Sequence, residues 1–389
     1  MKALLSGLKV LDLSRLLPGP LCTQLLADMG AEIIKIEQLP HGDPMRLAPP
    51  HLKDGSFLFS SINRNKRSLT LDLQKKEAKE IFFKLVKASD VVIESFRPNV
   101  MERLALSYET LKKINPKIIF CSVTGYGQTG PYKNLPGHDI NFVGYAGILD
   151  QTGYQGQPPA VSNFQIGDLA GGTLMATTSI LAATLHAHKT GEGSHLDVSM
   201  LEGALALSVM GLNQEVFSKG TGKKFSRGDS FVNGGAPGYG VYETKDKRYM
   251  AIGTIEEKFW KNFTRLVKRP DLEPLFGTRG EDSTKLRKEM ELLFKSQSQD
   301  YWTKLLSMEE TCVSPVLHFS EVLMDKHIRA RGLVIEGESP QFAFPVMVDG
   351  ERGSIKRPAP RVGEHNSEIL SGLGYGDDQI NKFKQEGVI

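Results

Sequence analysis

Short apolar runs alternate with amphipathic segments over the first 125 residues. The runs "LKVLDLS" and "AEIIKIE" are rich in branched residues, as buried strands are, and "GPLCTQLLADMG" between them has helical spacing. The pattern returns in "RSLTLDL", "KKEAKEIFFKLVKAS" and "DVVIES", and then in "NVMERLALSYETLKKINP" followed by "KIIFCSVTG". Repeated strand-helix-strand units with right-handed crossovers predict an α/β fold with a doubly wound parallel sheet.

The rest of the chain predicts more helix and a second domain. A long helix is expected from Asp168 to Gly191, where glycine ends it. "GVYETKDKRYMAIGTI" predicts a hairpin, and "KFWKNFTRLVK", "STKLRKEMELLFKS" and "SQDYWTKLLSM" predict amphipathic helices. Because 389 residues exceed what one core usually supports, we predict a large domain at 1–224 and 326–389 and a small domain at 225–325.

Charge, cysteine spacing and apolar run lengths exclude several classes of protein. A net charge of +3 is too small and dispersed to indicate nucleic-acid binding. Cys22, Cys121 and Cys312 lack the spacing of zinc or redox motifs, so we expect reduced thiols and no metal site. The sequence "MKALLSGLKVLDLS" has no signal-peptide pattern, and no apolar run reaches the roughly 18 residues of a membrane span. These observations predict a cytoplasmic protein without membrane partners.

Three residues are candidates for proton chemistry. His138 follows a Pro-Gly turn in "LPGHDINF", Asp168 begins a predicted helix, and Glu256 lies in "GTIEEKFW". Each also has a structural interpretation: a hydrogen-bonded histidine, a helix cap, and a solvated carboxylate at a helix start. Position alone leaves both interpretations open.

Ligands of doubly wound sheets bind at the carboxyl ends of the strands, here the loops after Ser14, Glu37, Ser95 and Thr124. The first loop, "RLLPGP", lacks the G-x-G-x-x-G pattern, which disfavours a nicotinamide enzyme. The cationic stretch "NRNKRS" and the arginines of "ESFRPNVMERL" indicate either a solvated surface or a phosphate site.

Ordered motifs along almost the whole chain resemble the class III CoA-transferase family, also called carnitine dehydratase-like. They are "VLDLSRLLPGP", "LLADMGAEIIKIE", "NRNKRSLTLDL", "ESFRPNVMERL", "GYGQTGP", "GHDIN", "GDLAGG", "KTGEGSHLDVSMLEG", "GGAPGYGVYET", "CVSPVL" and "RPAPRVGEH". The resemblance implies an interlocked homodimer, in which each chain has a Rossmann-like large domain, completed by its C-terminus, and a smaller α+β domain. It also implies coenzyme A as part of the substrate, with no permanently bound cofactor.

Two chemistries occur in this family. Racemase-like members carry histidine in "GHDIN", where formyl-CoA transferase-like members carry tyrosine. The resemblance therefore implies that His138 and Asp168 exchange the α-proton of a 2-methyl or other 2-substituted acyl-CoA, with Glu256 orienting His138 or relaying protons. The backbone N–H groups of Gly167 and Asp168 could stabilise the enolate. In the alternative, Asp168 attacks the thioester as a nucleophile and forms an aspartyl-acyl anhydride. A non-catalytic acyl-CoA-binding protein is a third possibility.

The resemblance also implies the remaining site residues. Substrate contacts are expected from Tyr239, Gly137, Gly167 and Asn163. Coenzyme A contacts are expected from Leu17, Pro18, Gln38, Lys66, Arg67, Leu71, Asp72, Leu73, Gln74, Ser95, Phe96, Arg97, Arg103 and Pro136. This chain departs from the family pattern twice, since Asn163 lies five residues before Asp168 instead of four, and Gln38 stands where many relatives have arginine.

Overall fold

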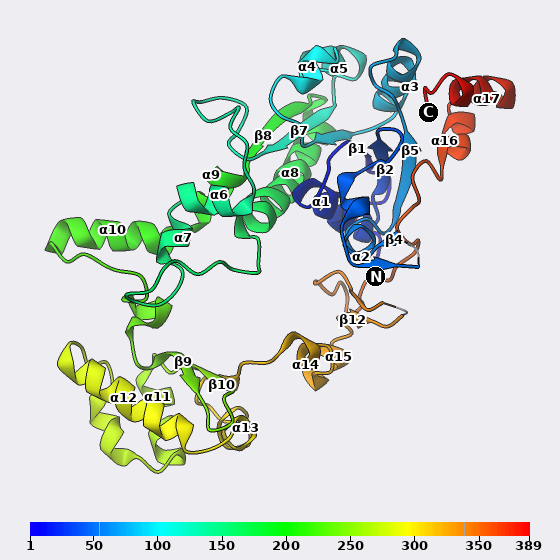
Figure 1. The fold of residues 1–389 in the computed structure, drawn as a ribbon. Helices are drawn as coiled ribbons and strands as arrows, with labels where there is room; N and C mark the ends of the chain where they lie inside the picture. The colour runs from blue at the N-terminus through cyan, green and yellow to red at the C-terminus, as the bar shows by residue number, and fades with distance from the viewer. Residues whose placement is uncertain (54, 338) are drawn as a thin grey trace. The chain divides into compact units, whose positions relative to one another are not determined.

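The computed structural model describes residues 1–53, 55–337 and 339–389, and the chain divides into two compact units (Figure 1). The large unit comprises 1–146, 163–207 and 326–389, and the small unit comprises 147–162 and 208–325. The segment 225–325, predicted as the small domain, falls within the small unit. Among the described residues, no helix combines the length and apolar character needed to cross a bilayer.

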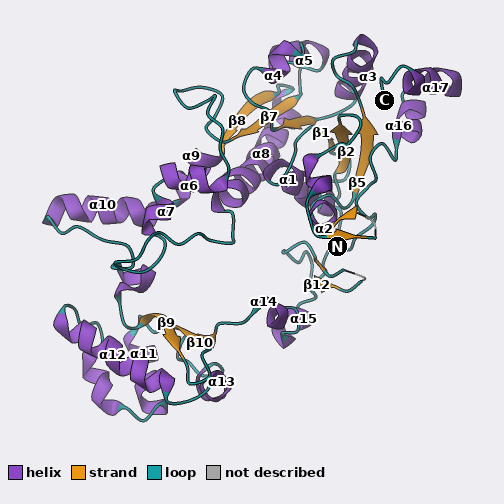
Figure 2. Ribbon diagram, viewed as in Figure 1, coloured by secondary structure: helices purple, strands orange, loops and turns teal. Residues whose placement is uncertain are grey.

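A six-stranded parallel sheet forms the centre of the large unit (Figure 2). Its order is β5-β2-β1-β6-β7-β8, with every neighbouring pair parallel. The strands are β1 (Lys9–Asp12), β2 (Glu32–Glu37), β5 (Lys66–Thr70), β6 (Val91–Glu94), β7 (Ile119–Thr124) and β8 (Ser194–Ser199). This is the Rossmann order 3-2-1-4-5-6, so the predicted doubly wound parallel sheet is confirmed. The order reverses between β1 and β6, the usual place for a ligand crevice.

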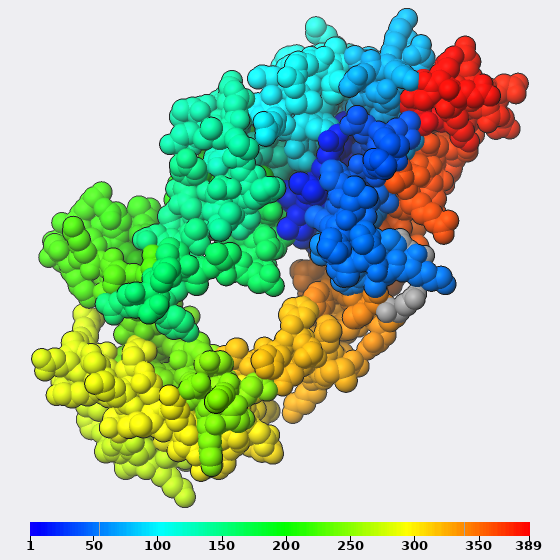
Figure 3. Space-filling model, viewed as in Figure 1, coloured from blue at the N-terminus to red at the C-terminus, as the bar shows by residue number. Residues whose placement is uncertain are grey.

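Helices cover both faces of this sheet because its strands direct apolar side chains both ways, as Val10 and Leu11 do on β1. One face packs against α3 (Lys76–Lys87), α5 (Tyr108–Ile114), α16 (Asn366–Gly372) and α17 (Asp377–Gln385). The other packs against α1 (Pro18–Asp28) and α8 (Met175–Thr190). The C-terminal residues, red in Figure 3, lie beside α3.

Two predicted elements differ in the structure. The segment 99–116, expected as one helix, forms α4 (Val100–Arg103) and α5, because Ala105 adopts a left-handed φ of 58° and Ser107 caps a new helix. The helix expected from Asp168 begins as the π-helix η2 (Gly167–Leu174) before continuing as α8. It ends at Gly191 as predicted, with φ 82°.

Close packing explains a glycine in η2. A Cβ on Gly171 would lie 2.1 Å from the carbonyl oxygen of Met200, the first residue of α9 (Met200–Leu207). Smaller elements complete the large unit: η1 (Pro44–Leu47), β3 (His51–Leu52), β4 (Gly55–Ser56), α2 (Phe57–Ser61), α6 (Asp139–Tyr145), α15 (Lys326–Ala330), β12 (Val334–Ile335) and β13 (Gln341–Phe342).

The small unit is built on an antiparallel sheet with the order β11-β10-β9. The predicted hairpin is confirmed as β9 (Tyr239–Glu243) and β10 (Tyr249–Gly253), and β11 (Val313–Pro315) joins it. The three predicted amphipathic helices are α11 (Glu257–Leu266), α12 (Glu281–Lys295) and α13 (Gln299–Leu306), whose aromatic side chains fill a third core. Its other elements are α7 (Ile148–Gln151), α10 (Val209–Thr221), η3 (Phe231–Gly235), η4 (Pro270–Leu275) and α14 (Phe319–Val322).

Candidate functional site

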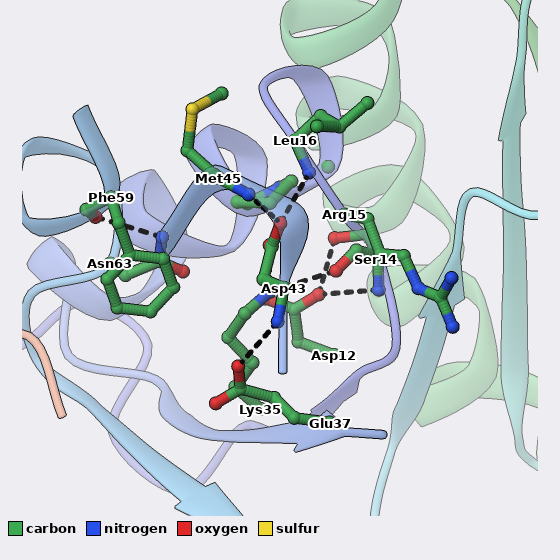
Figure 4. A network of polar contacts seen from close by, with 12 residues as sticks. Asp12, Ser14, Arg15, Leu16, Lys35, Glu37, Asp43, Met45, Phe59 and Asn63 are labelled. Atoms are coloured by element: carbon green, nitrogen blue, oxygen red, sulfur yellow. Dashed lines mark hydrogen bonds and ion pairs between the residues drawn. The ribbon is translucent and has the colours of Figure 1, made fainter. Parts of the chain in front are cut away.

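A buried ion cluster lies between β1, β2 and the loops that follow them (Figure 4). The amine of Lys66 lies 3.1 Å from Asp12 Oδ2 and also donates to Pro20 O and Asn63 Oδ1. Lys35 pairs with Asp43 at 2.9 Å. Burial lowers the pKa of Lys66 to about 8, although Asp12 opposes this shift. Burial would raise the pKa of Asp12, but both lysines and two hydroxyl donors outweigh it and hold that pKa below its ordinary value.

The cluster fixes the loop after β1. Asp43 Oδ1 accepts hydrogen bonds from the backbone N–H of Leu16 at 3.1 Å and of Met45 at 2.9 Å. On the other side of Arg15, the backbone N–H of Ser14 donates to Asp12 Oδ1 at 2.9 Å. Leu16 has a φ of 65°, which a branched residue adopts only when its surroundings hold it there. Buried carboxylates therefore hold the backbone on both sides of Arg15.

Most residues expected to contact coenzyme A lie in loops at the carboxyl ends of the strands. Leu17 and Pro18 follow β1, Gln38 follows β2, and the segment 71–74 follows β5. Ser95, Phe96 and Arg97 follow β6, and Arg103 ends α4 nearby in the chain. Because β1 and β6 are neighbours at the reversal of strand order, their loops meet: the backbone N–H of Arg15 donates to Ser95 Oγ at 2.9 Å.

Two cationic residues predicted to contact coenzyme A form ion pairs within the protein. The Lys66 side chain is fully buried in the ion cluster, where it pairs with Asp12. Arg67 pairs with Glu368 at 2.9 Å and with Glu32 at 3.6 Å, near the amino end of β5.

His138 and Asp168 come from two segments that a hydrogen bond joins. His138 is exposed and directly precedes α6, and its backbone N–H donates to Asn141 Oδ1 at 3.0 Å. The next residue, Asp139, accepts a hydrogen bond from the backbone N–H of Asp168 at 3.0 Å. A Cβ on Gly167 would approach the same Asp139 oxygen to 3.0 Å, so a larger residue at this position would crowd the Asp139 carboxylate. The structure thus brings the "GHDIN" turn against the start of η2.

The Asp168 carboxyl is poised near neutral pH. Burial, and secondarily the neighbouring charge of Asp139, raise its pKa from 3.8 to about 7. A group with this pKa both accepts and donates protons at physiological pH. The π-helix fits this setting, because such segments occur often at functional sites. Since the Asp168 N–H already donates to Asp139, it is not the free enolate donor expected from the sequence.

Asp139 is a residue of the candidate site that the sequence pattern did not indicate. It stands beside His138 in "GHDIN", but its effect depends on contact with Asp168, 29 positions later. Gly137 is close to Phe142 and Tyr126, since a Cβ there would meet Phe142 at 2.7 Å.

The other predicted residues are more exposed or lie in the small unit. Pro136 and Asn163 are exposed. Glu256 is exposed at the N-cap of α11, and Tyr239 begins β9, so both belong to the small unit. Their expected roles toward His138 stay predictions.

Comparisons with known proteins identify the family. Residues 5–366 match the model of CoA-transferase family III. The chain belongs to CoA-transferase family III. It is 33% identical over 390 residues to the human alpha-methylacyl-CoA racemase, covering 99% of this chain and 97% of the relative. It is 31% identical over 415 residues to an Escherichia coli formyl-CoA:oxalate CoA-transferase, covering 99% of each.

The fold is also similar to that of solved structures from the CaiB/BaiF family. A CaiB/BaiF family protein from Brucella suis superposes with a TM-score of 0.81 at 28% identity, covering 95% of this chain and 98% of that one. CoA-transferase family III thus includes relatives of this chain with two different named activities, and the chain is an enzyme of that family.

Proposed function

We propose that this protein racemises or epimerises 2-methyl and other 2-substituted acyl-CoA thioesters by two-base proton transfer through an enolate. One observation carries the proposal. The pKa of the Asp168 carboxyl is about 7, and the backbone N–H of Asp168 donates a hydrogen bond to Asp139, the residue next to His138. Imidazole and carboxyl side chains both act as general acids and bases in enzymes, so His138 and Asp168 are suited to be the two bases.

In the proposed reaction, one base removes the α-proton of the thioester and leaves an enolate. The other base then delivers a proton to the opposite face of the same carbon. Asp168 and His138 finish with their protonation states exchanged, so either enantiomer can serve as substrate. Glu256 would orient His138 or relay its proton, and Tyr239, Gly137, Gly167 and Asn163 would contact the acyl thioester.

Coenzyme A would bind along the carboxyl ends of the strands of the large unit, in the loops that contain Leu17, Gln38, Ser95 and Arg97. A homodimer is part of the proposal. Support comes from α10, which has no buried residue although apolar side chains project from it. The exposed ones are Val209, Met210, Leu212, Val216 and Phe217. Such an uncovered apolar surface suits burial against a second copy of the chain.

Deuterium exchange tests the proposal. The enzyme is incubated with a single enantiomer of a 2-methylacyl-CoA in deuterium oxide, and α-deuterium and optical configuration are followed together. We expect incorporation with loss of optical purity, abolished in D168N and strongly reduced in H138A. The control H188A removes an exposed histidine of α8 and should behave as the wild type. An unexchanged α-hydrogen with wild-type enzyme would refute the proposal.

A CoA-transferase is the second candidate, favoured by the similarity to a formyl-CoA:oxalate CoA-transferase. The Asp168 carboxylate would attack the thioester carbonyl, the C–S bond would break, and coenzyme A would leave as the thiolate. The CoA thiolate would then attack the Asp168 carbonyl of this anhydride, releasing the donor acid and leaving an aspartyl-CoA thioester. The acceptor carboxylate would displace the thiolate to form a second anhydride. Attack of the thiolate on the acyl carbonyl of the acceptor would give the new acyl-CoA and free the Asp168 carboxylate. Hydroxylamine trapping at Asp168, CoA transfer to a free carboxylic acid and retained activity in H138A would together favour this reaction.

A further inference from the structure

Arg15 joins three loops at the point where the strand order reverses. Its backbone N–H donates to Ser95 Oγ at 2.9 Å, in the loop after β6. Its guanidinium donates to Gln38 Oε1 at 3.3 Å, in the loop after β2. The guanidinium carbon lies 4.7 Å from the centre of the Phe96 ring. The side chain is therefore in contact with the loops after β1, β2 and β6 at once.

The charge of Arg15 has no direct counter-ion in the part of the chain that the structure describes. Among the residues that the structure describes, no carboxylate oxygen lies within 4.0 Å of its guanidinium, and the hydrogen-bond acceptor Gln38 is neutral. Burial lowers the pKa of Arg15, while the more distant charge of Asp43 opposes this effect. By contrast, the nearby Arg46 and Lys35 are each paired with a carboxylate. A half-buried cation on an aromatic ring, without a carboxylate partner, is suited to an anionic ligand.

The position of Arg15 is fixed before any ligand arrives. The backbone N–H of its neighbour Leu16 donates a hydrogen bond to Asp43, and that of its other neighbour, Ser14, donates one to Asp12. Figure 4 shows the guanidinium pointing away from these carboxylates. Binding would then require little ordering of the backbone, which reduces its entropic cost.

We infer that Arg15 binds a phosphate of the ADP moiety of coenzyme A. This inference rests on the proposed function, because it takes an acyl-CoA as the ligand. The planar guanidinium presents parallel N–H donors to two phosphate oxygens, while Phe96 and Gln38 keep it oriented. Nothing in the sequence pattern assigned this residue, since "RLLPGP" directs attention to the residues after it.

Isothermal titration calorimetry with coenzyme A tests the inference in R15Q, R15K and K87Q. A charge-assisted hydrogen bond contributes enough that we expect R15Q to weaken binding roughly 10- to 100-fold. R15K keeps the charge but loses the fork, so an intermediate loss is expected. K87Q removes the same charge from the last turn of α3, toward the other end of the strands, and should bind as the wild type does.

Dephospho-CoA identifies which phosphate is bound. A loss in R15Q with coenzyme A but not with dephospho-CoA assigns the 3′-phosphate, and an equal loss with both assigns the pyrophosphate. If R15Q binds coenzyme A as tightly as the wild type, the inference is overturned while the proposed function stands. If the wild-type protein itself binds no coenzyme A, both are overturned. Far-UV circular dichroism of each variant verifies that the fold is retained.

Discussion

Replacing the Asp168 carboxyl should stabilise the protein at neutral and alkaline pH. The pKa of this group is about 7 in the folded protein and 3.8 in its ordinary state, so the folded protein holds the proton more tightly than the unfolded chain. Stability from this group is therefore complete below about pH 4 and is lost as pH rises through 7. The shift corresponds to about 4 kcal/mol, as an upper value for a group with some solvent contact.

Asparagine has nearly the same shape but carries no charge at any pH. The free energy of unfolding of D168N should equal that of the wild type below about pH 4 and exceed it increasingly up to pH 7. Between pH 5 and pH 8 the advantage of D168N should grow by up to about 3 kcal/mol. The burial that raises the Asp168 pKa therefore costs stability at neutral pH while preparing this carboxyl for the proposed proton transfer.

Urea denaturation at several pH values measures this effect. Both tryptophans, Trp260 and Trp302, lie in the small unit, so far-UV circular dichroism is the better signal for the large unit. The control D378N removes an exposed carboxylate from the first turn of α17 and should show no such growth with pH. If D168N has the same advantage at pH 5 and pH 8, or none at pH 8, burial does not raise the Asp168 pKa as described.

Two further predictions concern neighbours in the same region. D139N keeps an oxygen to accept the Asp168 N–H but removes the like charge, so the pKa of Asp168 should fall. The limb of the pH–rate profile that reports Asp168 should move to lower pH in the deuterium-exchange assay, and an unmoved limb would contradict the electrostatic account. G171A places a Cβ 2.1 Å from the Met200 carbonyl oxygen, so it should lower the free energy of unfolding, measured by urea denaturation, by about 2 kcal/mol or more. The matched change G220A, on α10, meets nothing within 4 Å and should be neutral or slightly stabilising, so equal effects of the two would rule out the packing explanation.

The sequence predicts those parts of the fold that depend on local pattern. Five of the six strands of the central sheet are predicted, because runs such as "AEIIKIE" are buried on both faces. The edge strand β8 is not predicted, because "SHLDVS" is only partly buried and has no continuous apolar run. The break before α5 depends on the left-handed conformation of Ala105, which its identity does not indicate.

The local sequence pattern does not predict contacts between segments that are far apart in the chain. The run "NRNKRS" indicates a solvated surface or a phosphate site, yet Asn63, Arg64 and Lys66 are buried. Their burial is possible because Asp12 and Asp28, tens of residues earlier, supply carboxylates. The bond between Asp139 and Asp168 is hidden for the same reason. Pairings of this kind decide both the electrostatics of the candidate site and the geometry of the loop around Arg15.

The packing of the C-terminal residues affects how a nascent chain acquires its structure. The side chains of Val388 and Ile389 belong to the same core as Leu69 and Leu71, and the backbone N–H of Asp72 donates to Val388 O. On the ribosome, segments of the small unit emerge before these residues exist. One apolar face of the large unit's sheet is therefore incompletely covered until residues 366–389 have been synthesised. Contacts between segments so far apart in the sequence form slowly. The apolar face that is exposed in the meantime is a surface that chaperones can bind.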